Sequence, residues 1–262
     1  MKTLKNRLCC FFLAAAVFFC SQTASAQKIW SSGSAYTMPE KRIQTGLFQP
    51  LRYGLSERLE ISGHPIFFFI MPNLEIKYKH GKKGPILLTS VHSFYYPAYL
   101  LRTLAREGTG GIISPEFDIP HMFAVYNELR GTFEINEFHF YTVKAGISAA
   151  ARFGRLDKRT SIDLPLVYYR LDVFYNNYQL RIGTEFQGKI AGRWQYLADG
   201  KIFIIPGKKN AAAFEHTGLV LWNKSDTFQI SAGYKLVHAE YPFGTQWHLL
   251  LPLIDVQKAW QR

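Results

Sequence analysis

The sequence predicts an all-β protein, an antiparallel transmembrane β-barrel of about twelve strands with one short loop helix near residues 98–107. Three observations predict it. The chain begins with a secretory leader, its cysteines all lie within that leader, and the rest alternates between polar and apolar side chains. Successive side chains of a strand point to opposite faces, so this alternation gives most strands one apolar and one polar surface.

The first 26 residues have the composition of a signal peptide. Three basic residues precede an apolar stretch over residues 8–20, and a run of small residues ends at Ala26. The apolar stretch is shorter than the about 20 residues that a membrane-spanning helix needs. We therefore predict cleavage after Ala26, an N-terminal extension at 27–42 and a single barrel domain at 43–262.

The three cysteines are Cys9, Cys10 and Cys20, all within this leader. The exported part is therefore expected to hold no disulfide, no thiolate nucleophile and no cysteine metal site. A barrel needs no such covalent link, because closure of the sheet pairs every strand edge.

The alternation marks twelve candidate strands, most of them separated by turn residues. The clearest covers residues 178–190, which exceeds the roughly 9–11 residues that a tilted strand needs to cross a bilayer. The candidate strands lie near 43–54, 58–70, 73–80, 85–95, 116–128, 137–153, 162–175, 178–191, 193–205, 213–222, 227–239 and 246–258.

One turn allows a prediction of register. A two-residue hairpin turn at Asn176-Asn177 would pair the two flanking candidate strands and set Asp172 opposite Arg181. The apolar residues of the two strands would then also face one another. This register predicts an inward ion pair between the Asp172 carboxylate and the Arg181 guanidinium.

The polar faces of the candidate strands are expected to line the lumen. Apolar side chains outside and polar ones inside are typical of a membrane barrel, and a water-soluble barrel has the opposite arrangement. The 21 Phe, 15 Tyr and 5 Trp residues, many near strand ends, favour the membrane barrel because aromatic girdles form at both interfaces. The charged residues predicted to face the lumen are Lys77, Lys79, Lys144, Arg152, Asp172, Arg181, Glu185, Lys189 and Lys235.

A long connection over residues 97–115 interrupts the strand pattern. Leu100, Leu101 and Leu104 have helical spacing, and Gly108 follows as a C-terminal stop. We expect a helix packed over one mouth of the barrel; a plug, a lid or a membrane-surface helix are the alternatives. The strand count places this connection on the periplasmic side, where loops are usually short.

Residues 46–61, with the sequence GLFQPLRYGLSERLEI, resemble the strand–tight turn–strand units of bacterial outer-membrane β-barrel proteins. The resemblance implies location in the outer membrane of a Gram-negative bacterium and insertion by the barrel-assembly machinery. It also implies contact with membrane lipids and lipopolysaccharide. It supplies no functional residue.

The charge of the chain bears on its function. The formal net charge is +12, of which the leader contributes +3. Export and the lack of a nucleic-acid motif argue against nucleic acid as the partner. Contact with anionic lipid headgroups, a cation-lined interior, and simple decoration of rims and loops remain as explanations.

The leading hypothesis is a narrow, porin-like passive channel whose cation-lined lumen prefers small anionic solutes. A sealed structural or assembly barrel without transport is the first alternative. The second alternative is an outer-membrane lipid-modifying hydrolase or acyltransferase.

The sequence identifies no catalytic residue, no metal-ligand set and no cofactor motif, so an enzyme is less expected than a channel. The most suggestive local pair is His92-Ser93. Adjacent residues of a strand point to opposite faces, so these two side chains cannot act together as nucleophile and base.

Overall fold

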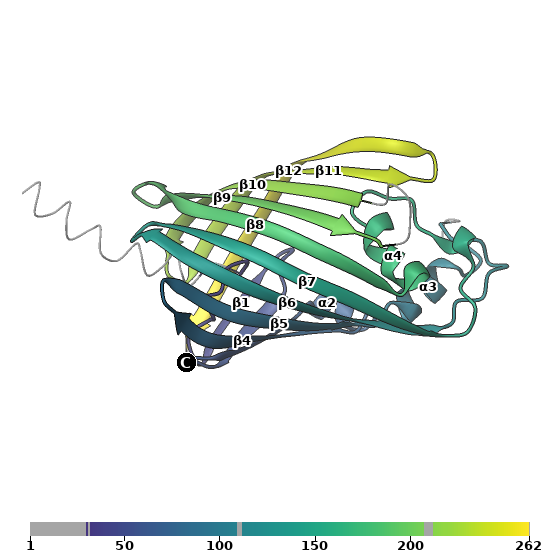
Figure 1. Cartoon of the computed structure of the whole chain (residues 1–262), viewed down its shortest axis with the longest axis horizontal. Helices are drawn as coiled ribbons and strands as arrows, with labels where there is room; N and C mark the ends of the chain where they lie inside the picture. The colour runs from purple at the N-terminus through teal and green to yellow at the C-terminus, as the bar shows by residue number, and fades with distance from the viewer. Residues whose placement is uncertain (1–29, 31, 109–111, 207–211, 262) are drawn as a thin grey trace, which may run out of the picture.

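The computed structural model describes residue 30 and residues 32–108, 112–206 and 212–261. The predicted signal peptide lies outside the described residues. Within them, twelve antiparallel strands form one closed barrel (Figure 1), in which each strand pairs with its neighbours in the sequence and β1 closes against β12. The prediction of an antiparallel barrel of about twelve strands is confirmed.

The strands differ greatly in length. The first three have five or six residues each, and the other nine have 10 to 18. In chain order they are β1 (Arg42–Gly46), β2 (Leu51–Ser56), β3 (Leu59–Gly63), β4 (Asn73–Lys83), β5 (Ile86–Tyr95), β6 (His121–Asn136), β7 (His139–Phe153), β8 (Tyr178–Ala191), β9 (Trp194–Ile204), β10 (Ala212–Ser225), β11 (Phe228–Tyr241) and β12 (Gly244–Gln261).

The strand count was right although two of the expected strands were wrong. The segment 43–54 forms two strands, β1 and β2, and the chain reverses between them at a connection that contains Pro50. Proline cannot donate to a sheet ladder, which favours a break at this point. The segment 162–175 contains no strand, because it includes the helix α4 (Tyr168–Asn176).

Asn177 explains why the prediction of a hairpin at residues 176–177 was wrong. It ends α4 in the left-handed conformation, with φ of 70°. Asparagine tolerates this conformation both in hairpin turns and at the C-terminal ends of helices, so the same residues fit either structure. The predicted cross-strand register of Asp172 and Arg181 is therefore wrong: β8 pairs with β7 and β9, and Asp172 lies on α4.

The two ends of the barrel have different connections. Two-residue turns join β2 to β3, β4 to β5, β6 to β7, β8 to β9 and β10 to β11, all at the end where β1 begins and β12 finishes. We call this the turn end. The opposite, loop end carries α2 (Pro65–Phe68), α3 (Ala98–Leu104), the short helix η1 (Lys158–Thr160) and α4, and Figure 1 shows α3 and α4 together there.

This arrangement corrects the side assigned to residues 97–115. Counting 43–54 as one strand had placed the connection with the short turns. Its helix α3, which confirms the expected loop helix, lies at the loop end with the other long connections. Short periplasmic turns and long external loops are the usual arrangement of outer-membrane barrels.

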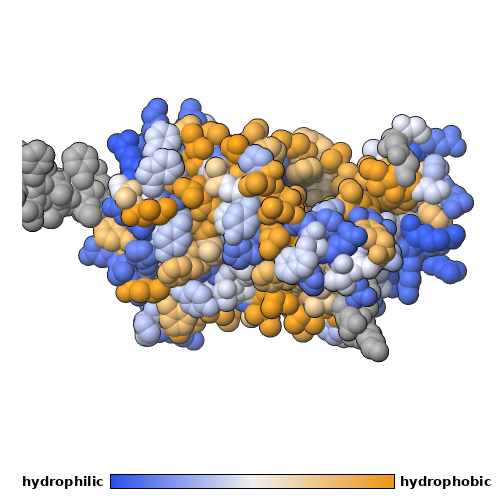
Figure 2. Space-filling model, turned by 90° about the horizontal axis from the view of Figure 1, so that it is seen from above, coloured by the Kyte–Doolittle hydropathy of each residue, from blue (hydrophilic) through white to orange (hydrophobic). Residues whose placement is uncertain are grey.

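The outer surface of the barrel is apolar. Leu129 and Leu249, for example, are 52% and 60% exposed, and Leu129 lies between the buried Glu128 and Arg130 on β6. Figure 2 shows apolar side chains over the middle of one face and polar ones gathered at both ends. The helix α2 adds Ile66 and the following Phe69 to this exposed apolar surface. No helix among the described residues is both long and apolar enough to cross a membrane.

The orientation of the barrel predicts that the loop end is accessible to reagents outside the cell and that the turn end is not. A Lys158→Cys variant places a thiol on the exposed helix η1, and an Arg58→Cys variant places one in an exposed turn at the turn end. We expect a membrane-impermeant maleimide to label Lys158→Cys on intact cells, and Arg58→Cys only after the outer membrane is permeabilised. If only Arg58→Cys were labelled on intact cells, the barrel would have the opposite orientation in the membrane.

Candidate functional site

The residues just before β1 fold back into the barrel. We call Ser32–Met38 the N-terminal segment. Ser34 and Ala35 are completely buried, and the Ala35 carbonyl accepts a hydrogen bond from Thr89 Oγ1 at 2.6 Å. The Ala35 N–H donates to Thr132 Oγ1 at 2.8 Å. Since both threonines lie a few residues from the turns, the segment occupies the turn end of the lumen.

Two buried cations hold the carbonyls of the N-terminal segment. Lys77 Nζ donates to the Tyr36 carbonyl at 2.5 Å and to the Ser32 carbonyl at 3.4 Å. Arg130 Nη1 donates to the same Ser32 carbonyl at 2.7 Å. These bonds replace the water that the lysine and arginine lose on burial.

Other buried charges form ion pairs inside the barrel. Lys144 Nζ lies 2.7 Å from both Glu185 Oε2 and Asp199 Oδ1, and Lys201 Nζ lies 2.6 Å from Asp199 Oδ2. Further pairs join Arg52 to Glu60 at 2.7 Å and Arg130 to Glu128 at 2.6 Å. Buried charges of this kind are tolerated only when they are paired.

These side chains surround a cavity of about 350 Å³, which we call the charged chamber. Ser32 and Gly33 of the N-terminal segment lie in its wall at the turn end. The charged residues that line it are six cations (Arg52, Arg130, Lys144, Arg181, Lys201 and Lys235) and five carboxylates (Glu60, Glu75, Glu128, Glu185 and Asp199).

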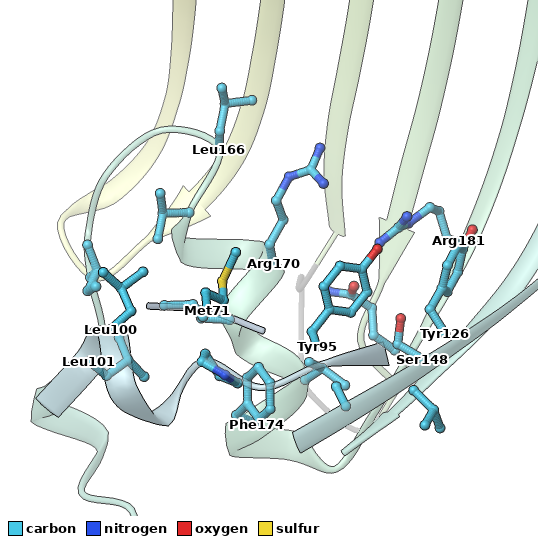
Figure 3. A pocket seen from close by; sticks show the side chains of 18 residues that line it. Met71, Tyr95, Leu100, Leu101, Tyr126, Ser148, Leu166, Arg170, Phe174 and Arg181 are labelled. Carbon is cyan, nitrogen blue, oxygen red and sulfur yellow. The ribbon is translucent and has the colours of Figure 1, made fainter. Parts of the chain in front are cut away.

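A second cavity of about 330 Å³, the apolar chamber, lies nearer the loop end. Leu100 and Leu101 of α3 and Phe174 of α4 line it (Figure 3). Leu171 of α4 also lines it. The sequence predicted one helix, at the position of α3, over one mouth of the barrel. In the structure both α3 and α4 cover the loop-end mouth. The residues that line both chambers are Tyr95, Tyr126 and Arg181.

Tyr169 and Arg170 attach α4 to the barrel wall. Both donate to the carboxylate of Glu215 on β10. Burial and the nearby Glu215 carboxylate raise the pKa of Tyr169, so its hydroxyl stays protonated and continues to donate. The helix is therefore fixed over the apolar chamber by a charged contact as well as by packing.

Arg181 is the exception among the interior charges. Its guanidinium lies 4.1 Å from the ring centre of Tyr126 and 4.6 Å from that of Phe203. Its Nε is buried without a hydrogen-bond partner, and no carboxylate among the described residues forms an ion pair with it. Asp172, its predicted partner, instead accepts a hydrogen bond from Asn176 Nδ2 at 2.7 Å.

The other residues predicted to face the lumen are distributed along the barrel. The structure brings Lys144 and Glu185 into contact, and it places both in the charged chamber with Arg181 and Lys235. Lys235 lies 3.4 Å from Glu215.

Three more of the predicted residues lie apart from the chambers. Arg152 Nη1 donates to the Phe174 carbonyl of α4 at 2.7 Å. Lys79 and Met38 line one surface cavity near the turn end, and Lys189 Nζ lies 4.7 Å from the ring centre of Phe138.

The sequence reasoning missed several interior charges. Glu128 and Arg130 lie two positions apart on β6, and the alternation of residues 121–136 could have placed them on one face. Arg52 and Glu60 lie on the neighbouring strands β2 and β3, and the expectation of a single strand over 43–54 had merged β2 with β1. The described residues contain no group of three or more potential ligands that could hold a metal ion.

No family model matches the sequence, and no curated protein matches it. Among solved structures, it is similar to OmpT, an in-vitro folded outer membrane protein of Vibrio cholerae in its trimer form. That match has 10% identity and a TM-score of 0.43, and it covers 81% of this chain and 64% of that one. It is also similar to the CymD monoaromatic hydrocarbon channel, with 8% identity, a TM-score of 0.37 and coverage of 84% and 51%.

The chain thus spans less than two thirds of the length of either protein. The closed antiparallel barrel that the resemblance to bacterial outer-membrane barrels implied is confirmed by the strand topology of the chain itself.

The buried pairs predict a strong effect on stability. A Lys144→Met variant leaves Glu185 and Asp199 without their shared cation. We expect the free energy of unfolding to fall by about 3–5 kcal/mol, measured by urea unfolding of the protein in lipid vesicles.

Lys82→Met is the matched control, because its 3.3 Å pair with Glu134 is largely exposed. It should change the same free energy by less than about 1 kcal/mol. Equal losses in the two variants would show that the buried ion pairs do not stabilise the barrel.

Proposed function

We propose that this protein is an outer-membrane barrel that passes small anionic solutes with an apolar portion, and that the N-terminal segment holds the lumen closed. The observation that carries the proposal is the position of Arg181. This cation, which forms no ion pair with a carboxylate among the described residues, lies where the apolar and charged chambers meet.

The two chambers together suit a solute of mixed character. Leucine and aromatic side chains of the apolar chamber can cover a ring or a short alkyl group. The Arg181 guanidinium offers a planar fork of donors to a carboxylate, and Lys201 and Lys235 continue the positive charge into the charged chamber.

The charged chamber by itself gives only a weak preference for anions, because six cations face five carboxylates. The preference rests instead on Arg181, since the other cations of the chamber make ion pairs or hold carbonyls. A fixed charge in a narrow lumen with low-dielectric walls selects ions strongly.

Passage through the turn end requires the N-terminal segment to move. Gly33 packs so closely that an added Cβ would lie 1.7 Å from Glu185 Oε2 and 2.9 Å from Lys144 Nζ. A side chain at this position would force the Glu185 carboxylate to shift relative to Lys144, and displacing the segment would open the charged chamber toward the turn end.

The proposed location is the bacterial outer membrane. In this proposal the leader is removed after Ala26, the barrel-assembly machinery inserts the chain, and lipids and lipopolysaccharide contact the apolar exterior. The exposed apolar band and the closed strand edges support it.

Conductance of the folded protein in a planar bilayer tests the closed lumen. We expect the wild type to open rarely and Gly33→Val to raise the open fraction at least severalfold, because the valine side chain would overlap Glu185. Ser32→Val is the matched control, since the Ser32 side chain is exposed. A folded Gly33→Val barrel that conducts no more than wild type would favour a sealed structural barrel.

Reversal potentials in a salt gradient test the role of Arg181. In the Gly33→Val background, Arg181→Gln should move the reversal potential toward equal permeability of anions and cations, because the unpaired charge at the junction is lost. Lys158→Gln removes one exposed charge on η1 that lines neither chamber, and it should leave the potential unchanged. An unaltered potential in Arg181→Gln would remove this residue from ion selection.

A further inference from the structure

A hydrogen-bonded group of serine, histidine and asparagine lies on the barrel wall. Ser90 Oγ is 3.1 Å from His92 Nε2, and His92 Nδ1 is 2.7 Å from Asn127 Oδ1. Ser90 and His92 are two positions apart on β5, so their side chains share one face. The pairing of β5 with β6 sets His92 directly opposite Asn127.

This group faces outward, toward lipid. The alternate residues of β5, such as Thr89 and Val91, are completely buried, which leaves Ser90 and His92 on the other surface. Ser93, the serine considered from the sequence, is on the buried face, where it donates to Glu75 Oε2 at 3.0 Å.

Exposed apolar side chains surround the polar group. Leu129 pairs with Ser90 across the β5–β6 ladder, Ile76 pairs with His92 across the β4–β5 ladder, and Val125 lies two positions from Asn127. Polar groups are expensive to place against hydrocarbon, and those that occur there are commonly functional. The position of these three polar side chains against lipid therefore indicates a functional role beyond the structure of the barrel.

The hydrogen bonds fix the direction of proton donation. Asn127 Oδ1 can only accept, so His92 Nδ1 carries the proton of the neutral imidazole. His92 Nε2 is then the acceptor, and the Ser90 hydroxyl donates to it. A histidine that accepts from a serine while a third residue orients it is the arrangement of an activated serine nucleophile.

His80 completes the surroundings of the serine. Its Nε2 lies 2.9 Å from Ser90 Oγ. Because the Ser90 proton is directed toward His92, His80 Nε2–H donates to the serine oxygen.

We propose that Ser90, His92 and Asn127 form an esterase site that hydrolyses the acyl esters of membrane lipids. The nucleophile is on the lipid-facing surface, within a band of apolar side chains that an acyl chain can lie against. The substrate therefore reaches Ser90 from the bilayer. The site is separate from the lumen and does not depend on the transport proposal.

The reaction proceeds in two balanced steps. Ser90 Oγ attacks the ester carbonyl carbon while His92 Nε2 takes its proton; the ester C–O bond then breaks, and the alcohol leaves with that proton. Water next attacks the acyl-Ser90 carbonyl, again giving a proton to His92. The acyl–oxygen bond to Ser90 breaks, the serine recovers the proton, and a fatty acid is released.

Full-length folded protein in vesicles of phosphatidylethanolamine and phosphatidylglycerol tests this site. Mass spectrometry would follow released fatty acid and lysophospholipid, and a fluorophosphonate reagent would mark an activated serine. We expect wild type to release both products and the label to map to Ser90. Ser90→Ala and His92→Ala should lower the rate by roughly 10²–10⁴-fold, with folding verified by heat-modifiable gel mobility.

Two further comparisons separate catalysis from packing. Ser93→Ala, three positions along the strand and on its buried face, should retain the wild-type rate. Asn127 is a positioning residue: Asn127→Ala should lower the rate, and Asn127→Asp should restore most of it because a carboxylate also accepts from His92 Nδ1. Folded wild type that neither releases fatty acid nor reacts with the fluorophosphonate would overturn the proposal, as would release that persists undiminished in Ser90→Ala.

Discussion

The pairing of β1 with β12 is the interaction on which the rest of this structure depends. Five residues of β1, Arg42–Gly46, pair with the last part of β12 and convert an open sheet into a barrel. A hydrocarbon environment offers no water to unpaired N–H and C=O groups, so a sheet is stable there only when no edge remains. Closure also separates an inner from an outer surface, and the alternation of each strand then decides which side chains meet.

The inner surface collects charges that would be costly if they were isolated. Lys144 with its two carboxylates, and Arg52 with Glu60, satisfy one another across neighbouring strands. The N-terminal segment has a similar effect, because its carbonyls receive the donors of Lys77 and Arg130. Toward the turn end the interior is thus filled by paired charges, whereas apolar residues pack together at the loop end. Two adjoining chambers remain.

Both candidate sites depart from the rule that polar side chains face the lumen and apolar side chains face lipid. Arg181 is a cation in the lumen without a carboxylate partner among the described residues, and Ser90, His92 and Asn127 are polar groups on the lipid-facing surface. Most other positions agree with the rule of polar inside and apolar outside. Local departures from an otherwise consistent pattern are where functional constraints are expected.

The sequence by itself determined the fold class, most strand positions, the helix α3 and the apolar exterior, because alternation along one strand is a local property. It could not determine α4, since residues 168–175 are rich in aromatic residues that also suit a strand and become helical where they pack over the barrel mouth. It also could not bring Asn127 to His92, or the N-terminal segment to Lys77. Those contacts join residues more than 30 positions apart, and only the register of neighbouring strands and the closure of the barrel place them together.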